Sequence, residues 1–476
     1  MAKFYYPNLD LFVYSLREGL GYSQTNIEEN HRLFWQLLPK SLQDLQAKAF
    51  TNEETARTTA YLELLLLGGY QSNAYTFCPE ETTELRFFRG SYTPVRLSDA
   101  YSLLVNCSLC KQEPQETDEF LPEREASSVV SSLQELKHYH EKSVKLDFLN
   151  PCPDGTEDHC KTPSPYLGKT WLISACIDFQ ADRDSIIQEI YEVFGLENWD
   201  ATTQVWGEFL GAQSCEIYEP PPQWKSLDQT VHILVLLFPN VRQFCQFYQS
   251  YPTWIKLFHY HNKINWAYWQ TRELKRRMMV RYGESFEIAK TLRDLTLLEL
   301  EKKLQKTTET LSDYVDNISY FGIQPHTIAT NLTNYEDCLQ ELQQNSETDL
   351  EFLAQFASIV KKKYLPQIES DRQTLHQGLR VLENLLQSIR GKIQIEQTKS
   401  QQEQIQSDRQ LNETIQVFGT GLAAASIAAA VLSTQVQQPQ TNQDKWHWGG
   451  ALSVSLLIGF LIGAIASLIV KSKRKK

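Results

Sequence analysis

The chain has 476 residues, more than one ordinary hydrophobic core needs and enough for two or three domains. Its formal net charge is −12, and because the C-terminal tail is basic, the rest of the chain is more acidic still. This acidity argues against nucleic acid as the main partner. The start of the chain lacks the basic-then-apolar layout of a secretion signal, and its nine cysteines are an odd number. We therefore expect a cytosolic soluble part with reduced thiols.

The first part of the chain has the spacing of helices. Apolar residues within 9–67 recur three and four positions apart, as they do on one face of a helix. We therefore predict that residues 1–80 form an N-terminal helical region.

The spacing of apolar residues no longer indicates helices after this region. Short β-rich runs bounded by turn residues predict strands at 84–88, 101–109, 169–179 and 232–240. Between two of them, 182–196 has helical spacing, with Asp182 as a candidate N-cap and Gly195 as a C-terminal stop. Strands that alternate with a helix predict a cytosolic α/β domain over 81–272.

Several cysteines in this domain have the spacing of zinc ligands. Cys107 and Cys110 form a CxxC pair, and Cys152, His159 and Cys160 follow in a later loop. Together they could supply the four nitrogen and sulfur ligands that zinc prefers. However, the CxxC pair lies in a strand-like run and not in a tight knuckle. Buried thiols are therefore the preferred interpretation.

Two His-x-His pairs are the other metal candidates. His138 and His140, and likewise His259 and His261, lack a third ligand at a telling spacing, so we interpret them as surface or packed histidines. The aromatic cluster in 258–269 is interpreted as core. The chain contains no P-loop, no dinucleotide-binding glycine motif in context and no Gly-x-Ser-x-Gly. Nothing in the sequence predicts an enzyme.

Long helices are predicted over 273–416. Residues 273–321 have helical composition, 322–331 contain a Gly and a Pro that we expect to break the helix, and 334–362 predict another helix. Pro366 is expected to start the last one. Its apolar residues follow heptad spacing at Leu375, Leu379, Leu382, Leu386, Ile389 and Ile393. We predict a coiled-coil-like stalk of antiparallel helices.

Two uncharged runs follow the stalk. The run 449–470 has no charged residue, and about 20 apolar residues are enough to cross a bilayer. The run 417–436 is also uncharged but only weakly apolar, which suits a helix inside a bundle. These runs predict a hairpin of two transmembrane helices, 417–436 and 451–470, joined by an external loop, 437–450.

The tail 471–476 sets the expected orientation. It is strongly basic, and basic segments stay on the cytosolic side of a membrane. A hairpin then places both ends of the chain in the cytosol. We therefore expect an integral protein of the plasma (inner) membrane, with the lipid bilayer as a partner.

The segment that leads into the first run resembles a known family. The sequence "LNETIQVF" at 411–418 is similar to the entry into the first membrane helix of CorA-type divalent-cation channels. The layout resembles that family too, with a cytosolic α/β domain, long stalk helices, a membrane hairpin and a Lys-rich tail. The resemblance implies a fold of mixed α+β and mainly α character. It also implies a homo-oligomer, a pentamer in the family, with Mg2+ as its usual ion.

One departure from the family concerns ion selection. The family carries Gly-Met-Asn directly after the first membrane helix, whereas this chain has Val436, Gln437 and Gln438 there and no Gly-Met-Asn anywhere. Glutamine carbonyl oxygens can hold a hydrated Mg2+ or another divalent cation. Gln437 and Gln438 are therefore candidate ion contacts, although the turn that Gly provides is missing.

The resemblance implies further pore residues. Asn412 matches the polar residue at the inner end of the pore, although a solvated stalk residue is an equal interpretation. Thr420 and Ser426 are candidate pore-lining residues, or small residues at helix contacts. The tail resembles the family's basic collar but also suits a plain topology signal. Its basic residues are Lys471, Lys473, Arg474, Lys475 and Lys476.

Two functions remain open at this point. The first is a CorA-like divalent metal-ion channel or transporter formed by the oligomerised first membrane helices. The alternative is a membrane protein of CorA-like architecture that does not conduct selectively: a sensor or scaffold with an unknown cytosolic partner, or an effector that permeabilises membranes. The missing Gly-Met-Asn favours the alternative.

Overall fold

The computed structural model describes residues 3–19, 22–44, 61–67, 88–109, 127–146, 164–178, 181–197, 200, 204–292, 294–344 and 348–405. The chain divides into two compact units. The first unit comprises Met1–Glu284 and Leu311–Val381, and the second comprises Ser285–Thr310 and Leu382–Lys476.

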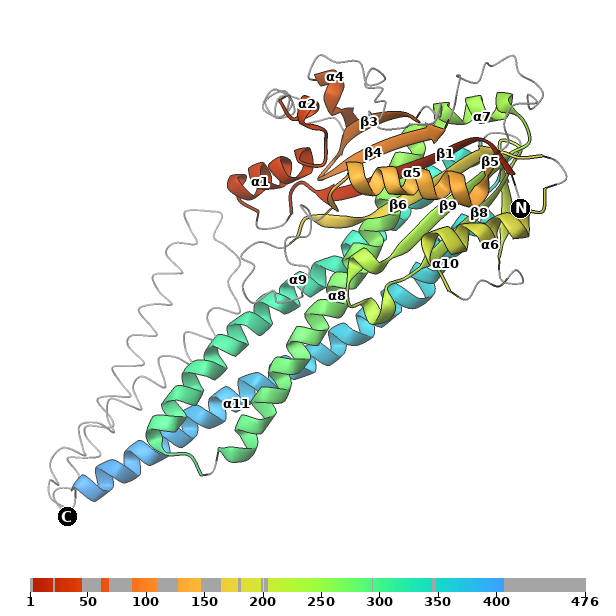
Figure 1. The fold of residues 1–476 in the computed structure, drawn as a ribbon. Helices are drawn as coiled ribbons and strands as arrows, with labels where there is room; N and C mark the ends of the chain where they lie inside the picture. Colours follow the sequence, from red (N-terminus) through yellow and green to blue (C-terminus); the bar gives the residue numbers. More distant parts are fainter. Residues whose placement is uncertain are drawn as a thin grey trace, which may run out of the picture. The chain divides into compact units, whose positions relative to one another are not determined.

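A ten-stranded sheet forms the centre of the first unit (Figure 1). Its strand order is β10-β7-β8-β9-β6-β1-β4-β3-β2, and β5 pairs with β1. Strands β6 and β9 are parallel, and the other pairs are antiparallel. The strands are β1 (Lys3–Leu16), β2 (Tyr61–Glu63), β3 (Phe88–Leu97), β4 (Ala100–Leu109), β5 (Ser127–Ser128), β6 (Tyr166–Cys176), β7 (Trp206–Phe209), β8 (Ala212–Glu219), β9 (Val231–Phe238) and β10 (Thr348–Asp349).

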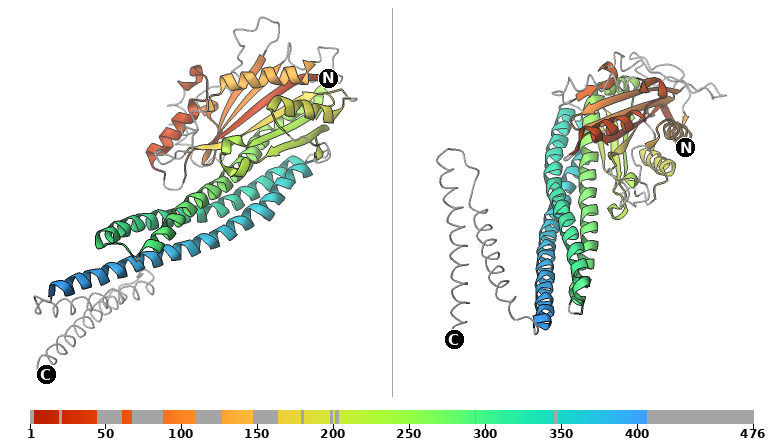
Figure 2. Two further views of the ribbon diagram at one scale, coloured as in Figure 1. Left: turned by 60° about the horizontal axis from the view of Figure 1, so that its bottom comes forward. Right: turned by 90° about the vertical axis from the view of Figure 1, so that its left-hand side faces the viewer.

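Helices cover both faces of the sheet. Helices α5 (Val129–Ser143) and α6 (Arg183–Phe194) cover one face, here called the α5 face. Helix α8 (Tyr251–Thr291) lies against the opposite face, here called the α8 face (Figure 2). The shorter helices are α1 (Gln24–Trp35), α2 (Lys40–Gln43), α4 (Leu64–Leu67), η3 (Pro222–Trp224), η4 (Leu227–Gln229), α7 (Val241–Phe247) and η5 (Tyr248–Ser250).

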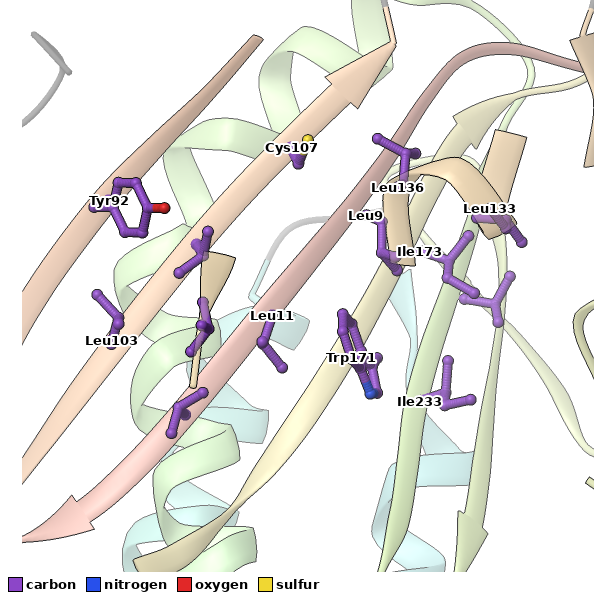
Figure 3. Packing of buried hydrophobic residues seen from close by; sticks show 14 of the residues in the cluster. Leu9, Leu11, Tyr92, Leu103, Cys107, Leu133, Leu136, Trp171, Ile173 and Ile233 are labelled. Atoms are coloured by element: carbon purple, nitrogen blue, oxygen red, sulfur yellow. The ribbon is translucent and has the colours of Figure 1, made fainter. Parts of the chain in front are cut away.

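The main hydrophobic core lies on the α5 face (Figure 3). Leu9 and Leu11 of β1 and Ile173 of β6 alternate toward this face, because successive strand residues point to opposite sides of a sheet. They pack with Leu133 and Leu136 of α5, and all five are buried. Each such side chain contributes roughly 1.5–3 kcal/mol when it is removed from water.

Long helices follow strand β9 in the chain. They are α8, α9 (Leu297–Gln343) and the continuous series α10 (Glu351–Ile359), η6 (Val360–Tyr364) and α11 (Leu365–Ile405), with the short strand β10 between α9 and α10. Within the second unit, Ile288, Leu300, Leu385 and Ile389 form a buried cluster that joins the end of α8, the start of α9 and α11. The heptad prediction is confirmed at Leu375, Leu382, Leu386 and Ile389, which are buried, whereas Leu379 and Ile393 are only partly buried.

The predicted helical region at 1–80 is wrong at its start. Lys3–Leu16 forms β1, which lies between β6 and β4 inside the sheet, so the α/β domain does not begin at residue 81. Almost every residue of β1 is buried, because helices cover both faces of the strand. Such a strand lacks the alternation that marks a half-exposed one. Helices do form at Gln24–Trp35 and Lys40–Gln43.

Two prolines were also misjudged. Pro325 lies inside α9, so residues 322–331 do not break the helix, and the buried residues Phe321, Ile328 and Leu332 on both sides of it supply packing that outweighs the lost hydrogen bond. Pro366 is the second residue of α11 but does not begin a separate helix, because α11 continues α10 and η6 without a break. That π-helical turn accommodates a residue without an N–H group.

The other predicted elements of this domain are confirmed where the structure describes them. Strands β4, β6 and β9 match the runs at 101–109, 169–179 and 232–240. Helix α6 begins after Asp182, whose side chain accepts from the Asp184 N–H, and ends at Gly195 in the left-handed region with φ 65°. The segments 84–87 and 417–476 lie outside the described residues.

Candidate functional site

The α8 face of the sheet carries several buried polar side chains among apolar ones such as Phe12 and Leu172, whereas the core on the α5 face is apolar. Neighbouring strands place Asp10 of β1, Thr170 of β6, Glu216 of β8 and His232 of β9 on this face. Except for Glu216, which is partly buried, these residues are almost completely buried. Because a buried polar group needs a partner, each of them indicates a specific contact with another strand or with α8.

His232 lies at the centre of a chain of hydrogen bonds. Its Nε2 is 2.9 Å from Glu216 Oε1, and its Nδ1 is 2.8 Å from Thr170 Oγ1. Because a carboxylate only accepts, His232 Nε2 is the donor to Glu216. Asn262 of α8 donates to Thr170 Oγ1 at 2.8 Å. The imidazole is therefore held at both nitrogens, by two strands and indirectly by α8.

His261 of α8 stacks on His232. The two ring centroids are 3.8 Å apart, with an interplanar angle of 23°. Burial, and then the neighbouring His232, hold the pKa of His261 well below its usual value, so the ring is neutral. Its Nδ1 lies 3.4 Å from Asn265 Nδ2. Its Nε2 is buried and has no hydrogen-bond partner among the described residues.

Glu216, His232 and His261 form a group with metal-ligand chemistry. One carboxylate oxygen and two imidazole nitrogens all lie within 4.8 Å of one another. Phe356 of α10 closes one side, with its ring centroid 4.0 Å from that of His261. Tyr218 donates to Asn265 Oδ1 at 2.9 Å and lies 3.2 Å from the Tyr364 hydroxyl.

A second polar cluster surrounds Asp10. Its carboxylate accepts from Asn106 at 2.6 Å, from Asn8 at 3.1 Å and from the Tyr251 hydroxyl of α8. Burial raises the pKa of Asp10 from 3.8 to about 7, although these three hydrogen bonds favour the charged form. This carboxyl group therefore changes its charge near neutral pH.

The predicted histidine and cysteine candidates are placed only in part. Cys107 is buried on the α5 face, and burial raises its pKa, which confirms the buried-thiol interpretation for this residue. His138 is exposed, and the buried His140 donates from Nε2 to the Leu9 carbonyl at 2.8 Å. The other proposed zinc ligands, Cys110, Cys152, His159 and Cys160, lie outside the described residues.

The His-x-His pattern missed the partners of His261. His259 is also buried on α8, but the ring that joins His261 is His232, which comes from a strand. A spacing rule along the chain cannot find this pair, because sheet register and helix docking create it. One available signal was His232 itself, a titratable residue within the apolar run of β9.

The predicted pore residues lie outside the described residues. They are Asn412, Thr420, Ser426, Gln437 and Gln438, and the same holds for the basic tail residues Lys471, Lys473, Arg474, Lys475 and Lys476. Among the helices that the structure describes, none is both long enough and apolar enough to cross a bilayer. The pore hypothesis therefore stays a prediction from the sequence.

Comparisons with known proteins give similarity to solved structures only. No protein-family model and no curated protein matches the chain. A solved structure, the CorA magnesium transporter from Methanocaldococcus jannaschii, is similar over 65% of this chain and 91% of that one, at 13% sequence identity. Its TM-score is 0.13, which is too low to assign a family or an activity.

Proposed function

We propose that the chain is a CorA-like integral membrane protein whose first membrane helices assemble into a pathway for divalent cations. One observation carries this proposal. An α/β sheet domain is followed by long helices, and the last of them, α11 with 41 residues, is followed in the sequence by the two uncharged runs. This order matches the layout that the resemblance at 411–418 implies.

The proposed mechanism uses amide oxygens and water. Mg2+ sheds its water shell reluctantly, so a ring of amide side chains can select it while it stays hydrated. In an oligomer, Asn412 would form such a ring at the inner end, and Gln437 and Gln438 would form one at the outer mouth. The acidic character of the soluble part raises the local concentration of cations. Shifts of the long helices would open and close the path.

Reconstitution in liposomes tests this proposal. Purified full-length protein, placed in vesicles that contain a Mg2+-sensitive dye, is expected to give Mg2+- or Co2+-dependent flux. Asn412→Ala and Gln437→Ala are expected to lose most of it. Gln443→Ala is the matched control, because it removes an amide from the same external loop away from the proposed mouth. Gel filtration verifies that each variant assembles.

Absence of flux at every cytosolic Mg2+ concentration, from protein that is oligomeric and inserted, would refute the transport function. That result would support the second candidate, a membrane-anchored sensor, scaffold or permeabilising effector, which the absence of Gly-Met-Asn favours. Leakage of a large dye together with Mg2+ would indicate the permeabilising form. A monomer or dimer in detergent would contradict both the cation pathway and the permeabilising pore, because each needs several copies of the chain.

A further inference from the structure

We propose that Glu216, His232 and His261 form a binding site for one first-row transition-metal ion of the Zn2+ class, between the sheet and α8. The donor set is two imidazoles and one carboxylate, with the ligand atoms within 4.8 Å of one another. Imidazole nitrogen suits Zn2+, Co2+ and Ni2+, whereas Mg2+ prefers oxygen ligands. The ion bound here is therefore not the cation proposed for transport.

The free ring nitrogen of His261 is the observation that points to a ligand. His261 is fully buried, and its Nε2 has no hydrogen-bond partner among the described residues. Leaving a buried polar atom unpaired costs roughly 1–3 kcal/mol. A metal ion shared with His232 Nε2 and Glu216 Oε1 would pair that nitrogen. Three protein ligands leave the fourth position of a tetrahedral ion to water.

Polar side chains lie next to the Nδ1 atoms of His232 and His261, the ring nitrogens that would not bind the metal. Thr170 Oγ1 lies 2.8 Å from His232 Nδ1, the nitrogen that faces away from Glu216, and Asn262 fixes that hydroxyl. Asn265 Nδ2 lies beside His261 Nδ1, and a half turn of its amide would present the carbonyl oxygen to an N–H there, in exchange for the hydrogen bond that Oδ1 now accepts from Tyr218. A metal-bound histidine commonly donates its other N–H to such an acceptor.

Binding requires a limited rearrangement. The stacked rings must separate, so that both Nε2 atoms point at one centre, and the proton between His232 and Glu216 must leave. The ion would then add a link between β8, β9 and α8, in addition to the Tyr218–Asn265 hydrogen bond between β8 and α8 and the Thr170–Asn262 hydrogen bond between β6 and α8. It would therefore stabilise the docking of α8 on the sheet.

Titration with Co2+ tests the site, because Co2+ in a tetrahedral nitrogen and oxygen environment has a visible absorption band. Full-length protein in detergent is stripped with a chelator and titrated with CoCl2. The wild type is expected to show the band and a higher melting temperature. His261→Asn and Glu216→Gln are expected to remove both, and excess Mg2+ is expected to leave the wild-type band unchanged.

Two further variants separate ligation from folding. His259→Asn removes another buried histidine of α8 that lies outside the cluster, so it is expected to keep the band. Thr170→Val keeps the shape of the side chain but removes the hydroxyl next to His232 Nδ1. It is expected to lower the affinity for Co2+ about 10–100-fold. A variant that melts differently without metal is set aside in favour of the others.

A wild-type protein without the band, or His261→Asn and Glu216→Gln variants with wild-type affinity, would overturn the proposal. If His259→Asn loses the Co2+ band to the same extent, the losses in the ligand variants come from general damage to α8, and the proposal is likewise overturned. The inference does not rest on the proposed transport. Flux of Mg2+ and binding of Co2+ are measured separately, and either can fail alone.

Discussion

The two faces of the central sheet are built from the same strands and differ in chemistry. On the α5 face, Leu9 and Ile173 belong to a continuous apolar core. On the α8 face, the adjacent residues Asn8 and Ser174 are polar and hydrogen-bonded to each other. Apolar burial dominates the contact between the sheet and α5, whereas the α8 face places titratable groups such as Asp10 and His232 against a helix. The main apolar core therefore lies on one face of the sheet, and the proposed metal site lies on the other.

The largest expected effect is on the α5 face. Trp171→Ala removes a buried ring that packs against His140 and Phe194. Because the surroundings collapse only partly into the cavity, we expect a loss of about 3–5 kcal/mol in stability. Urea denaturation followed by circular dichroism measures it. Ile395→Ala is the control. Because the Ile395 side chain is exposed, this substitution should lower the stability by less than about 0.5 kcal/mol.

A pH effect is expected on the α8 face. Burial raises the pKa of Asp10 from 3.8 to about 7, so the folded chain keeps a proton there that the unfolded chain loses near pH 4. The stability from this proton is fully present below about pH 4 and is lost as pH rises through 7. Between pH 5 and pH 8 the loss should be about 3 kcal/mol, at about 1.4 kcal/mol per pKa unit.

Comparison of wild type with Asp10→Asn measures this effect. The titratable group that contacts Asp10 is Tyr251 of α8, and burial raises the pKa of its hydroxyl; Cys107 of β4 lies nearby but on the opposite face of the sheet, and burial raises its pKa too. We expect the melting temperature of the wild type to fall from pH 5 to pH 8 more than that of Asp10→Asn. Parallel curves would show that Asp10 does not titrate in this range.

Two glycines give the smallest effects and a direct comparison of the faces. Gly168 of β6 has φ 139°, and an added Cβ would collide with the Asn262 side chain on the α8 face. Gly195 has φ 65° at the end of α6, with open space around it. Gly195→Ala should cost about 1 kcal/mol from backbone strain alone. Gly168→Ala adds a clash and should cost about 1–3 kcal/mol.

Thermal unfolding measures the stability lost in Gly168→Ala and in Gly195→Ala. In Gly168→Ala, displacement of Asn262 should also weaken Co2+ binding, because Asn262 holds the Thr170 hydroxyl behind His232. Gly195→Ala should leave Co2+ binding unchanged. If both variants bind Co2+ alike, Asn262 does not support the proposed site.

Local patterns predicted much of the secondary structure. The cap at Asp182, the stop at Gly195 and the heptad residues Leu382 and Ile389 depend on neighbours within a few turns, so they are visible in the sequence. Strand β1 was missed, because burial on both faces removes the alternation that the prediction relies on. Pro325 was misjudged, because packing from other elements outweighs a local helix breaker.

By itself the sequence determined the coarse order of the protein: an acidic part with strands and helices, long heptad helices, two uncharged runs and a basic tail. Only the tertiary structure decided which side chains meet. Glu216, His232 and His261 come from two strands and a helix, and no spacing along the chain relates them. Their proximity follows from the register of β8 with β9 and from the docking of α8, both of which are long-range packing events.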